Sequence, residues 1–304
     1  MLELISSLLQ MLLGIFALTP DTGIEPHNQP LQQRIPGGVA LIDIGPHTQR
    51  PSATFRGKAV MLLPPDEQQD NWTAVVGLPL SAKPGQHSIK INDLTHTFDV
   101  RGHAYKEQRL TVKRKHVNLS KEALTRVRSE KKKMLKAFRH FEPNAEWQPM
   151  AWPLKGPLSS PFGLQRYFNG QKRNPHSGLD IAAPTGTPIV APSDGKVTLT
   201  GDFYFNGNTV FLDHGQGLVS MFCHLDSIEV KDSDILTAGD RLGTVGATGR
   251  VTGPHLHWTV SLNDARINPL LMLSPHPGVL SKALEVSAAH DKAQATQTAQ
   301  VDPR

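Results

Sequence analysis

The chain has 304 residues, enough for two ordinary domains that each bury a core of their own. Its apolar content of 38%, its 25 Gly and 24 Pro and its few aromatic residues favour short strands joined by turns and argue against a helical bundle. The net charge of +5 is uneven, since residues 101–140 contain 14 Lys or Arg against 3 Asp or Glu, and the single cysteine, Cys223, excludes an intrachain disulfide.

Residues 1–25 are predicted to be a signal or anchor segment. The stretch MLELISSLLQMLLGIFALTP has an apolar core of signal-peptide length, although it carries Glu3 where an export signal has positive charge. We favour a signal over a membrane span, because Ser6, Ser7 and Gln10 interrupt a run that needs about 20 apolar residues to cross a bilayer. The protein is therefore predicted to be exported to the periplasm or cell envelope.

Residues 30–105 are predicted to form a small β domain of sandwich type. Short apolar runs alternate here with Pro, Gly and Asp, which is the pattern of strands separated by turns. The predicted strands are GGVALIDIG, KAVMLLP, WTAVVGLPL, HSIKIND and LTHTFDV.

Residues 106–148 are predicted to be a basic helical linker. Asn118 or Ser120 can cap a helix, Pro143 ends it, and apolar residues recur near helical spacing at Leu124, Val127, Met134, Leu135 and Phe138. The charged face of such a helix is usually only exposed to solvent. It can also bind nucleic acid, anionic lipid or an anionic wall polymer, or restrain access to the groove of the catalytic domain. We rank nucleic acid last, because few aromatic side chains accompany the charge.

Residues 149–275 are predicted to form a nearly all-antiparallel sheet with long loops, followed by a disordered tail over residues 276–304. Frequent turn sequences such as PSDGK and DHGQGL separate the strands, while the tail is small and polar. The whole chain is thus predicted to be mainly β, with an N-terminal β-sandwich-like domain, a basic linker helix and a C-terminal antiparallel domain. Cys223, in the apolar stretch LVSMFCHL, is predicted to be a buried, unreactive thiol.

Three histidine motifs in this last region carry candidate chemistry. His176 and Asp180, in HSGLD, lie in a run too rich in Gly and Pro for a helix, so they are predicted on a loop that enters a strand. In GPHLHWTV, strand geometry places His255 and His257 on one face. His224 adds a polar residue to an apolar strand, and together these imidazoles and the carboxylate are a ligand set that suits Zn²⁺.

Each motif alone also has a plain structural explanation. Two histidines two residues apart on a strand are more often a surface or packing feature than a metal site, and an isolated HxxxD is weaker still. His214, in DHGQG, is interpreted as part of a turn between strands and is given no metal role. The combination of ligand types within one domain is what favours a metal site.

The motifs HSGLD and HLH, with the histidine of MFCHLDS between them, resemble the lysostaphin-type (LytM-like) zinc metallopeptidases, which are bacterial cell-wall endopeptidases. The resemblance covers about residues 153–270, including PTGTPIVAPSDGKV and GATGRVTGPHLHW, and RIPGGVALIDIG to AVVGLPLSAKPG resembles the N-terminal domain of some periplasmic members. One departure is Phe222, where many relatives have Tyr.

The resemblance implies that His176, Asp180 and His257 bind zinc, and that His224 and His255 serve catalysis without holding the metal. Because the strand places His255 beside the ligand His257, His255 is predicted to act as the general base, and His224, from another strand, is predicted to hydrogen-bond the tetrahedral oxyanion. The implied partner is peptidoglycan. The bond between D-alanine and diaminopimelate is the first choice for the bond that is cut, and the pentaglycine bridge is the second. The alternative is a non-catalytic module that binds the wall or activates another hydrolase, although all five positions are intact. A monomer is expected, with a regulatory protein as a candidate partner besides peptidoglycan.

Overall fold

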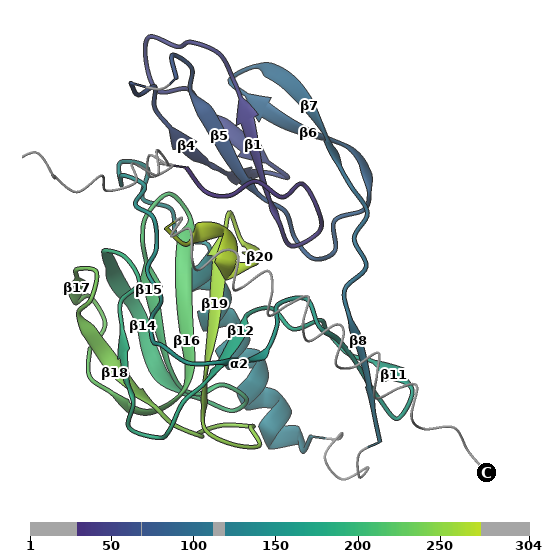
Figure 1. Ribbon diagram of the computed structural model, residues 1–304, viewed down its shortest axis with the longest axis vertical. Coiled ribbons are helices and arrows are strands. Elements are labelled where there is room, and N and C mark those ends of the chain that lie inside the picture. Colours follow the sequence, from purple (N-terminus) through teal and green to yellow (C-terminus); the bar gives the residue numbers. More distant parts are fainter. Residues whose placement is uncertain (1–28, 68, 112–118, 275–304) are drawn as a thin grey trace, which may run out of the picture.

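The computed structural model describes residues 29–67, 69–111 and 119–274 and is mainly β, as predicted. The predicted signal or anchor segment and the predicted tail lie outside these residues. Within the described ranges, no helix is long and apolar enough to cross a membrane. Figure 1 shows a small sandwich at one end of a larger sheet, with one long helix against the face of that sheet.

The sandwich consists of two antiparallel sheets, as predicted. The first has the order β1-β5-β4 and the second the order β3-β2-β6-β7. The side chains between them are apolar, including Ile42, Phe55 and Ile89. The strands are β1 (Val39–Asp43), β2 (Ala53–Phe55), β3 (Lys58–Ala59), β4 (Met61–Leu63), β5 (Thr73–Gly77), β6 (Gly85–Ile91) and β7 (Leu94–Val100). All five predicted strands are present, while β2 was not predicted.

The first of these sheets is buried on both faces. In β5, Ala74 and Val76 point into the sandwich, whereas Val75 joins the core of the larger sheet together with Val39 and Met61. The two cores are therefore separated by a single layer of strands. The sandwich packs against the larger sheet and is not a freely tethered unit.

Asn263 connects the sandwich and the larger sheet, because its side-chain amide bonds to both the backbone N–H and the backbone C=O of Gly77. Its Oδ1 accepts from Gly77 N at 2.7 Å and its Nδ2 donates to Gly77 O at 3.0 Å, both in buried surroundings. Asn263→Ala should therefore lower the free energy of unfolding by about 2–4 kcal/mol, because two buried backbone groups lose their partners. Asn92→Ala is a matched control, since Asn92 is exposed and shares a positive φ (49° against 44°). Equal unfolding midpoints in urea for the two variants would contradict this role.

The segment between the sandwich and the larger sheet contains a strand as well as the predicted helix. β8 (Glu107–Leu110) pairs in parallel with β10 (Gln165–Phe168), which in turn pairs with β11 (Gln171–Lys172). The helix α2 (Lys121–Phe138) begins at Ser120, whose hydroxyl accepts from Ala123 N at 3.2 Å. The predicted helix is thus confirmed, and Ser120 is its cap.

The larger sheet has ten strands, and its pairings are antiparallel. Its main order is β17-β14-β15-β16-β19-β12-β9, with β13, β18 and β20 attached beside this path. The strands are β9 (Leu158–Ser160), β12 (Leu179–Ala182), β13 (Pro188–Val190), β14 (Gly195–Phe203), β15 (Gly207–Asp213), β16 (Leu218–Ile228), β17 (Ile235–Leu236), β18 (Arg241–Val245), β19 (His255–Leu262) and β20 (Ala265–Ile267). A 3-10 turn, η2 (Pro269–Met272), follows.

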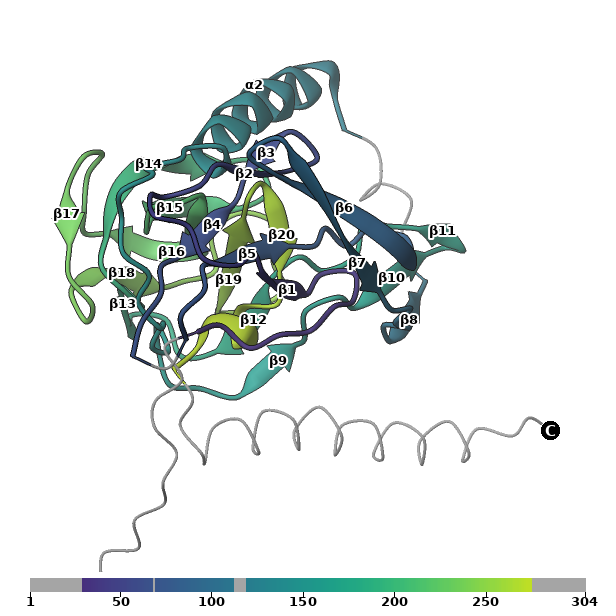
Figure 2. The same ribbon diagram turned by 90° about the horizontal axis from the view of Figure 1, so that it is seen from above.

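The two faces of this sheet are covered differently. One face carries the main apolar core, including Phe222 and Trp258. On the other face, Phe138 at the end of α2 packs edge-on against Phe211 at 5.0 Å between ring centroids. Figure 2 shows α2 along one side of the sheet, away from the strands β9 and β12. The helix therefore does not cover the β12 side of this face, where the candidate site lies.

Candidate functional site

Strand register brings two of the predicted ligands together. Asp180 on β12 pairs directly with His257 on β19 in the antiparallel ladder. Leu256 and Trp258 are buried on the opposite face of β19. The predicted alternation of the HLH motif is therefore confirmed, and it holds an imidazole beside a carboxylate on a rigid sheet.

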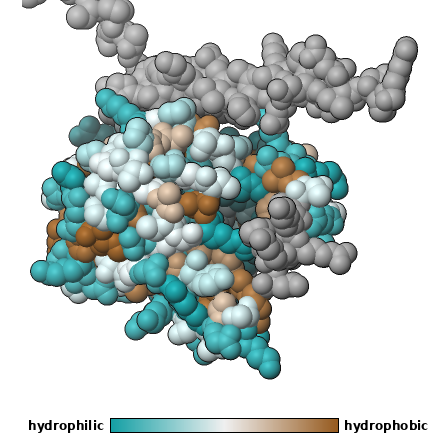
Figure 3. All heavy atoms as spheres, turned by 90° about the horizontal axis from the view of Figure 1, so that it is seen from below, coloured by the Kyte–Doolittle hydropathy of each residue, from teal (hydrophilic) through white to brown (hydrophobic). Residues whose placement is uncertain are grey.

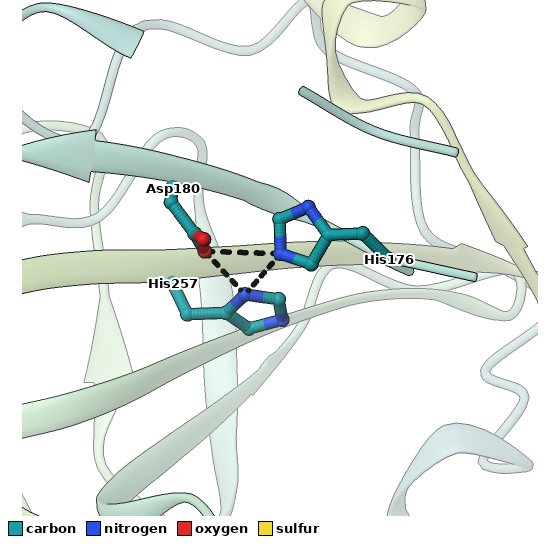
Figure 4. A group of neighbouring side chains, drawn as sticks. All are labelled: His176, Asp180 and His257. Atoms are coloured by element: carbon teal, nitrogen blue, oxygen red, sulfur yellow. Dashed lines mark hydrogen bonds and ion pairs between the residues drawn. The ribbon is translucent and has the colours of Figure 1, made fainter. Parts of the chain in front are cut away.

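His176 reaches these two residues from the loop before β12, as Figure 4 shows. Its backbone is fixed on both sides, because its carbonyl accepts from Gly163 N at 2.8 Å and its N–H donates to Leu164 O at 3.0 Å. Its ring Nδ1 lies 2.8 Å from the Pro161 carbonyl oxygen. A carbonyl only accepts, so Nδ1 carries the proton and Nε2 of the neutral ring presents a lone pair to the site.

Three ligand atoms converge at one point. His176 Nε2 lies 3.0 Å from Asp180 Oδ1 and 3.0 Å from His257 Nδ1, and the last two atoms are 2.7 Å apart. The far nitrogen of His257, Nε2, lies 2.9 Å from the Thr259 hydroxyl oxygen, which can accept a hydrogen bond from a protonated Nε2. With both outer nitrogens protonated, three lone pairs face one another, and a cation between them removes the repulsion. The donor set therefore fits a divalent metal with nitrogen and oxygen ligands.

The glycine of HSGLD is required by this convergence. A Cβ at Gly178 would lie 2.5 Å from the Trp258 carbonyl oxygen and 2.8 Å from the His257 ring. Any larger residue would push the loop off β19 and move His176 away from the other two ligands. The glycine therefore allows a close approach.

The local electrostatics favour an ionised carboxylate among neutral rings. Burial acts to raise the pKa of Asp180, but the neighbouring imidazoles of His176 and His257 outweigh it and hold that pKa far below its usual value. Burial lowers the pKa of His257, which keeps its ring neutral at pH 7. Ionised carboxylate and neutral imidazole are the protonation states in which these groups bind metals.

His224 is aimed at the site by a β-bulge. Asn208 and Val210 of β15 pair with Leu225 and Phe222 of β16, so β16 contains one extra residue at this point. His224 has φ of 67°, in the left-handed region, and its N–H donates to Asn206 O at 2.8 Å. A bulge of this kind turns a side chain out of the regular alternation. The sequence predicted the residue but not the bulge that orients it.

His224 and His255 lie side by side beside the three ligands. Their ring centroids are 4.9 Å apart, and His255 Nε2 lies 3.8 Å from Asp180 Oδ1. Both rings turn Nδ1 towards a backbone carbonyl, that of Thr248 at 3.0 Å and that of Gly253 at 2.9 Å. Burial, reinforced by the nearby His257, lowers the pKa of His224 to about 4. The two carbonyls therefore hold a proton on Nδ1 of each ring, which leaves Nε2 as the ring nitrogen without a backbone partner.

Two other predicted residues have structural roles. His214 is half-buried, with ring nitrogens 2.7 Å from the Asp194 carbonyl oxygen and 2.9 Å from the Ser220 hydroxyl, and it lies outside the metal-capable group found in the described residues. Cys223 is buried, and burial raises the pKa of its thiol to about 12. The prediction that Cys223 is buried is therefore confirmed.

Thr259 is a functional candidate that the sequence reasoning missed. It lies two residues after His257, on the same face of β19, and its hydroxyl is hydrogen-bonded to the ring of that ligand. The same alternation that predicted His255 and His257 could have identified it. The Pro161 carbonyl, in contrast, has no sequence signal, because every residue carries a carbonyl.

Comparison with known proteins identifies the family. The protein-family model described as "Peptidase family M23" matches residues 174–269. A second family model, "Peptidase family M23 N-terminal domain", matches residues 32–102. A solved structure from Pseudomonas aeruginosa, assigned to peptidase M23, is 43% identical with a TM-score of 0.68, and the match covers 80% of this chain and 96% of that one. The chain belongs to peptidase family M23. This confirms the resemblance to lysostaphin-type enzymes.

Curated relatives of this M23 chain are named as enzymes of the cell wall. It is 36% identical over 138 residues to the DD-carboxypeptidase/endopeptidase Mpg of Neisseria meningitidis, covering 45% of this chain and 32% of Mpg. It is 35% identical over 136 residues to the peptidoglycan DD-endopeptidase ShyA of Vibrio cholerae, covering 44% of this chain and 30% of ShyA. The matched part of the M23 chain thus spans about a third of the length of these relatives.

Proposed function

We propose that this chain is a zinc metalloendopeptidase that hydrolyses peptide cross-links of bacterial peptidoglycan, most directly the bond between D-alanine and the side-chain amine of diaminopimelate. The observation that carries the proposal is the meeting of three lone pairs from His176, Asp180 and His257, with the outer nitrogens of both rings held by the Pro161 carbonyl and the Thr259 hydroxyl. The named activities of Mpg and ShyA support the substrate class. Export to the periplasm or cell envelope is part of the same proposal.

Each of the three ligands holds the ion through one named atom in this proposal. His176 through Nε2, Asp180 through Oδ1 and His257 through Nδ1 hold the ion. Zinc, when bound, supplies a Lewis acid that polarises the scissile carbonyl and makes hydroxide available near neutral pH. The sheet register fixes two of the three ligands, so the site needs little rearrangement when substrate arrives.

His255 and His224 handle protons and charge. His255 takes the proton of the attacking water at Nε2 and delivers it to the leaving amine, because its Nδ1 proton is held by the Gly253 carbonyl. His224 is proposed to donate from Nε2 to the developing oxyanion. Burial keeps this ring neutral, with its one proton on Nδ1 and bonded to Thr248 O. The role therefore requires the other tautomer, in which that bond is given up and the single ring proton lies on Nε2.

Digestion of purified peptidoglycan tests this function. The zinc-loaded chain should convert cross-linked dimers into monomers, and mass spectrometry should find the new amine on diaminopimelate. A pentaglycine-bridged wall is the comparison substrate and should be cut much more slowly. Binding to the wall without any conversion would instead favour the alternative, a non-catalytic module that binds the wall or activates another hydrolase.

The basic helix α2 is proposed to help the chain stay on the anionic wall. Lys131, Lys132 and Lys133 are exposed on it, and Figure 3 shows hydrophilic residues between small apolar patches on the face viewed from below. Changing all three to Gln should weaken retention on peptidoglycan roughly tenfold at low salt and leave cleavage of a small soluble substrate unchanged. The control removes three exposed charges from the sandwich, with Lys83, Lys90 and Arg101 changed to Gln. Equal losses in a pull-down at low salt would make net charge, not α2, responsible.

A further inference from the structure

A second cleft lies beside the candidate metal site, where the sandwich meets the larger sheet. Its volume is about 840 Å³, within the range of ligand-binding pockets, which often occur where two domains meet. Pro175 and Ser177 line it and flank the ligand His176 in the chain. The remaining walls come from separate parts of the protein and include Leu80, His103, Leu135 and Arg266.

The charges that line this cleft balance, with Arg266 and Lys172 against Asp264 and Glu107, but the cluster around Asp264 is locally positive. Asp264 lies 2.7 Å from Arg139 Nε, 3.6 Å from Arg266 and 3.8 Å from Lys58, so three cations share one carboxylate. Of the three, Arg266 is a lining residue, and its side chain is 22% exposed. Burial lowers its pKa to about 10, which still leaves it charged at neutral pH.

Arg266 is also held in a fixed orientation. Its guanidinium carbon lies 3.4 Å from the centroid of the Phe138 ring, and Nη1 donates to the Ser261 hydroxyl and the Asp264 carbonyl, both at 3.1 Å. Among the described residues, the bonds of this guanidinium involve Nη1 alone. A planar guanidinium held in this way suits the paired oxygens of a carboxylate.

The spacing along β19 between His257 and Ser261, the partner of Arg266, matches the length of a short peptide. Ser261 lies four residues beyond His257 on the same face of β19. At about 3.4 Å per residue this is roughly 14 Å, which is also the reach of about four residues of an extended peptide. A peptide bound at the metal site can therefore place a carboxylate at Arg266.

We infer that this cleft binds one arm of the peptide substrate, and that Arg266 receives a carboxylate about four residues from the bond that is cut. The inference rests on the proposed function for the identity of the substrate. It makes the sandwich part of the substrate site, since Leu80 and Ser81 form one wall of the cleft. It also explains why the two parts share a rigid contact.

Direct binding to the full chain tests this subsite without any need for turnover. The probes are a linear stem peptide with free carboxylates and the same peptide with each carboxylate amidated in turn, titrated by calorimetry into the zinc-loaded protein. One amide should weaken binding roughly 10- to 100-fold, the loss that accompanies removal of a charge-assisted hydrogen bond. Equal affinity for the acid and all its amides overturns the subsite.

Variants then locate the effect. Arg266→Gln should bind the acid and the critical amide equally, and Arg266→Lys should keep part of the preference, because it retains charge but loses the planar fork. Arg241→Gln, at an exposed ion pair with Glu229, is the control and should keep the full preference. A preserved preference in Arg266→Gln would overturn the assignment. If Arg266→Gln fails to fold, the comparison of acid and amides on the unaltered chain still decides. Tight, selective binding of the acid by a chain that leaves cross-linked dimers uncut would contradict the proposed function and leave the subsite supported.

Discussion

Asp180→Ala should abolish both zinc binding and peptidoglycan cleavage while the sandwich stays folded. Asp180 supplies the one negative charge among the three convergent ligands, and both other ligand atoms lie within 3.0 Å of its Oδ1. Without it, two neutral rings remain, and two ligands hold zinc far more weakly than three. Hydrolysis should fall by about 10³-fold or more, since the main electrostatic stabilisation of the transition state is lost.

Metal content and turnover should be measured on the same preparations. Asp202→Ala is the matched control, because Asp202 is an exposed aspartate on the same sheet that pairs with Arg126. That variant should keep its zinc and its activity. Near-ultraviolet circular dichroism checks the fold of both. Full zinc occupancy in Asp180→Ala would contradict the assignment of the ligands.

His255→Ala and His224→Ala should each keep zinc but lose kcat by roughly 10²–10⁴-fold. Neither ring is among the three convergent ligands, although His255 Nε2 lies 3.8 Å from Asp180 Oδ1. Their loss therefore removes a proton acceptor or an oxyanion partner and leaves the ligands in place. The double variant should be little worse than the poorer single one, since groups that act on one transition state are not additive.

The structure supplies a control for this experiment in His214, which is half-buried and hydrogen-bonded to Ser220 but lies outside the metal-capable group of the described residues. His214→Ala should lower the unfolding midpoint and leave kcat of the folded protein nearly unchanged. Zinc lost from His255→Ala would make His255 a ligand. Near-normal turnover in His224→Ala would remove His224 from the chemistry.

Local sequence patterns predicted much of the site. The HLH motif has strand periodicity, and that alone places His255 and His257 on one face. The Gly and Pro around His176 excluded a helix and indicated a loop leading into a strand, where β12 begins at Leu179. Short apolar runs between turns likewise predicted the five sandwich strands, because each run is long enough to bury one face.

Features that depend on distant parts of the chain were not predictable in this way. The bulge at His224 arises from a mismatch in register between β15 and β16, which no single strand encodes. β8 is polar and forms because β10 offers its free edge, so its sequence resembles a loop. The cation group at Asp264 joins Lys58, Arg139 and Arg266 from three separate elements, and only the fold brings them together.

Removal and return of the metal test the central claim most directly. The full chain should be treated with a chelator, dialysed, and assayed on cross-linked muropeptide dimers before and after titration with zinc. The account predicts no conversion by the metal-free chain and full recovery at about one zinc per chain. Conversion of dimers by the metal-free chain, or zinc binding at one equivalent with no conversion, would contradict it.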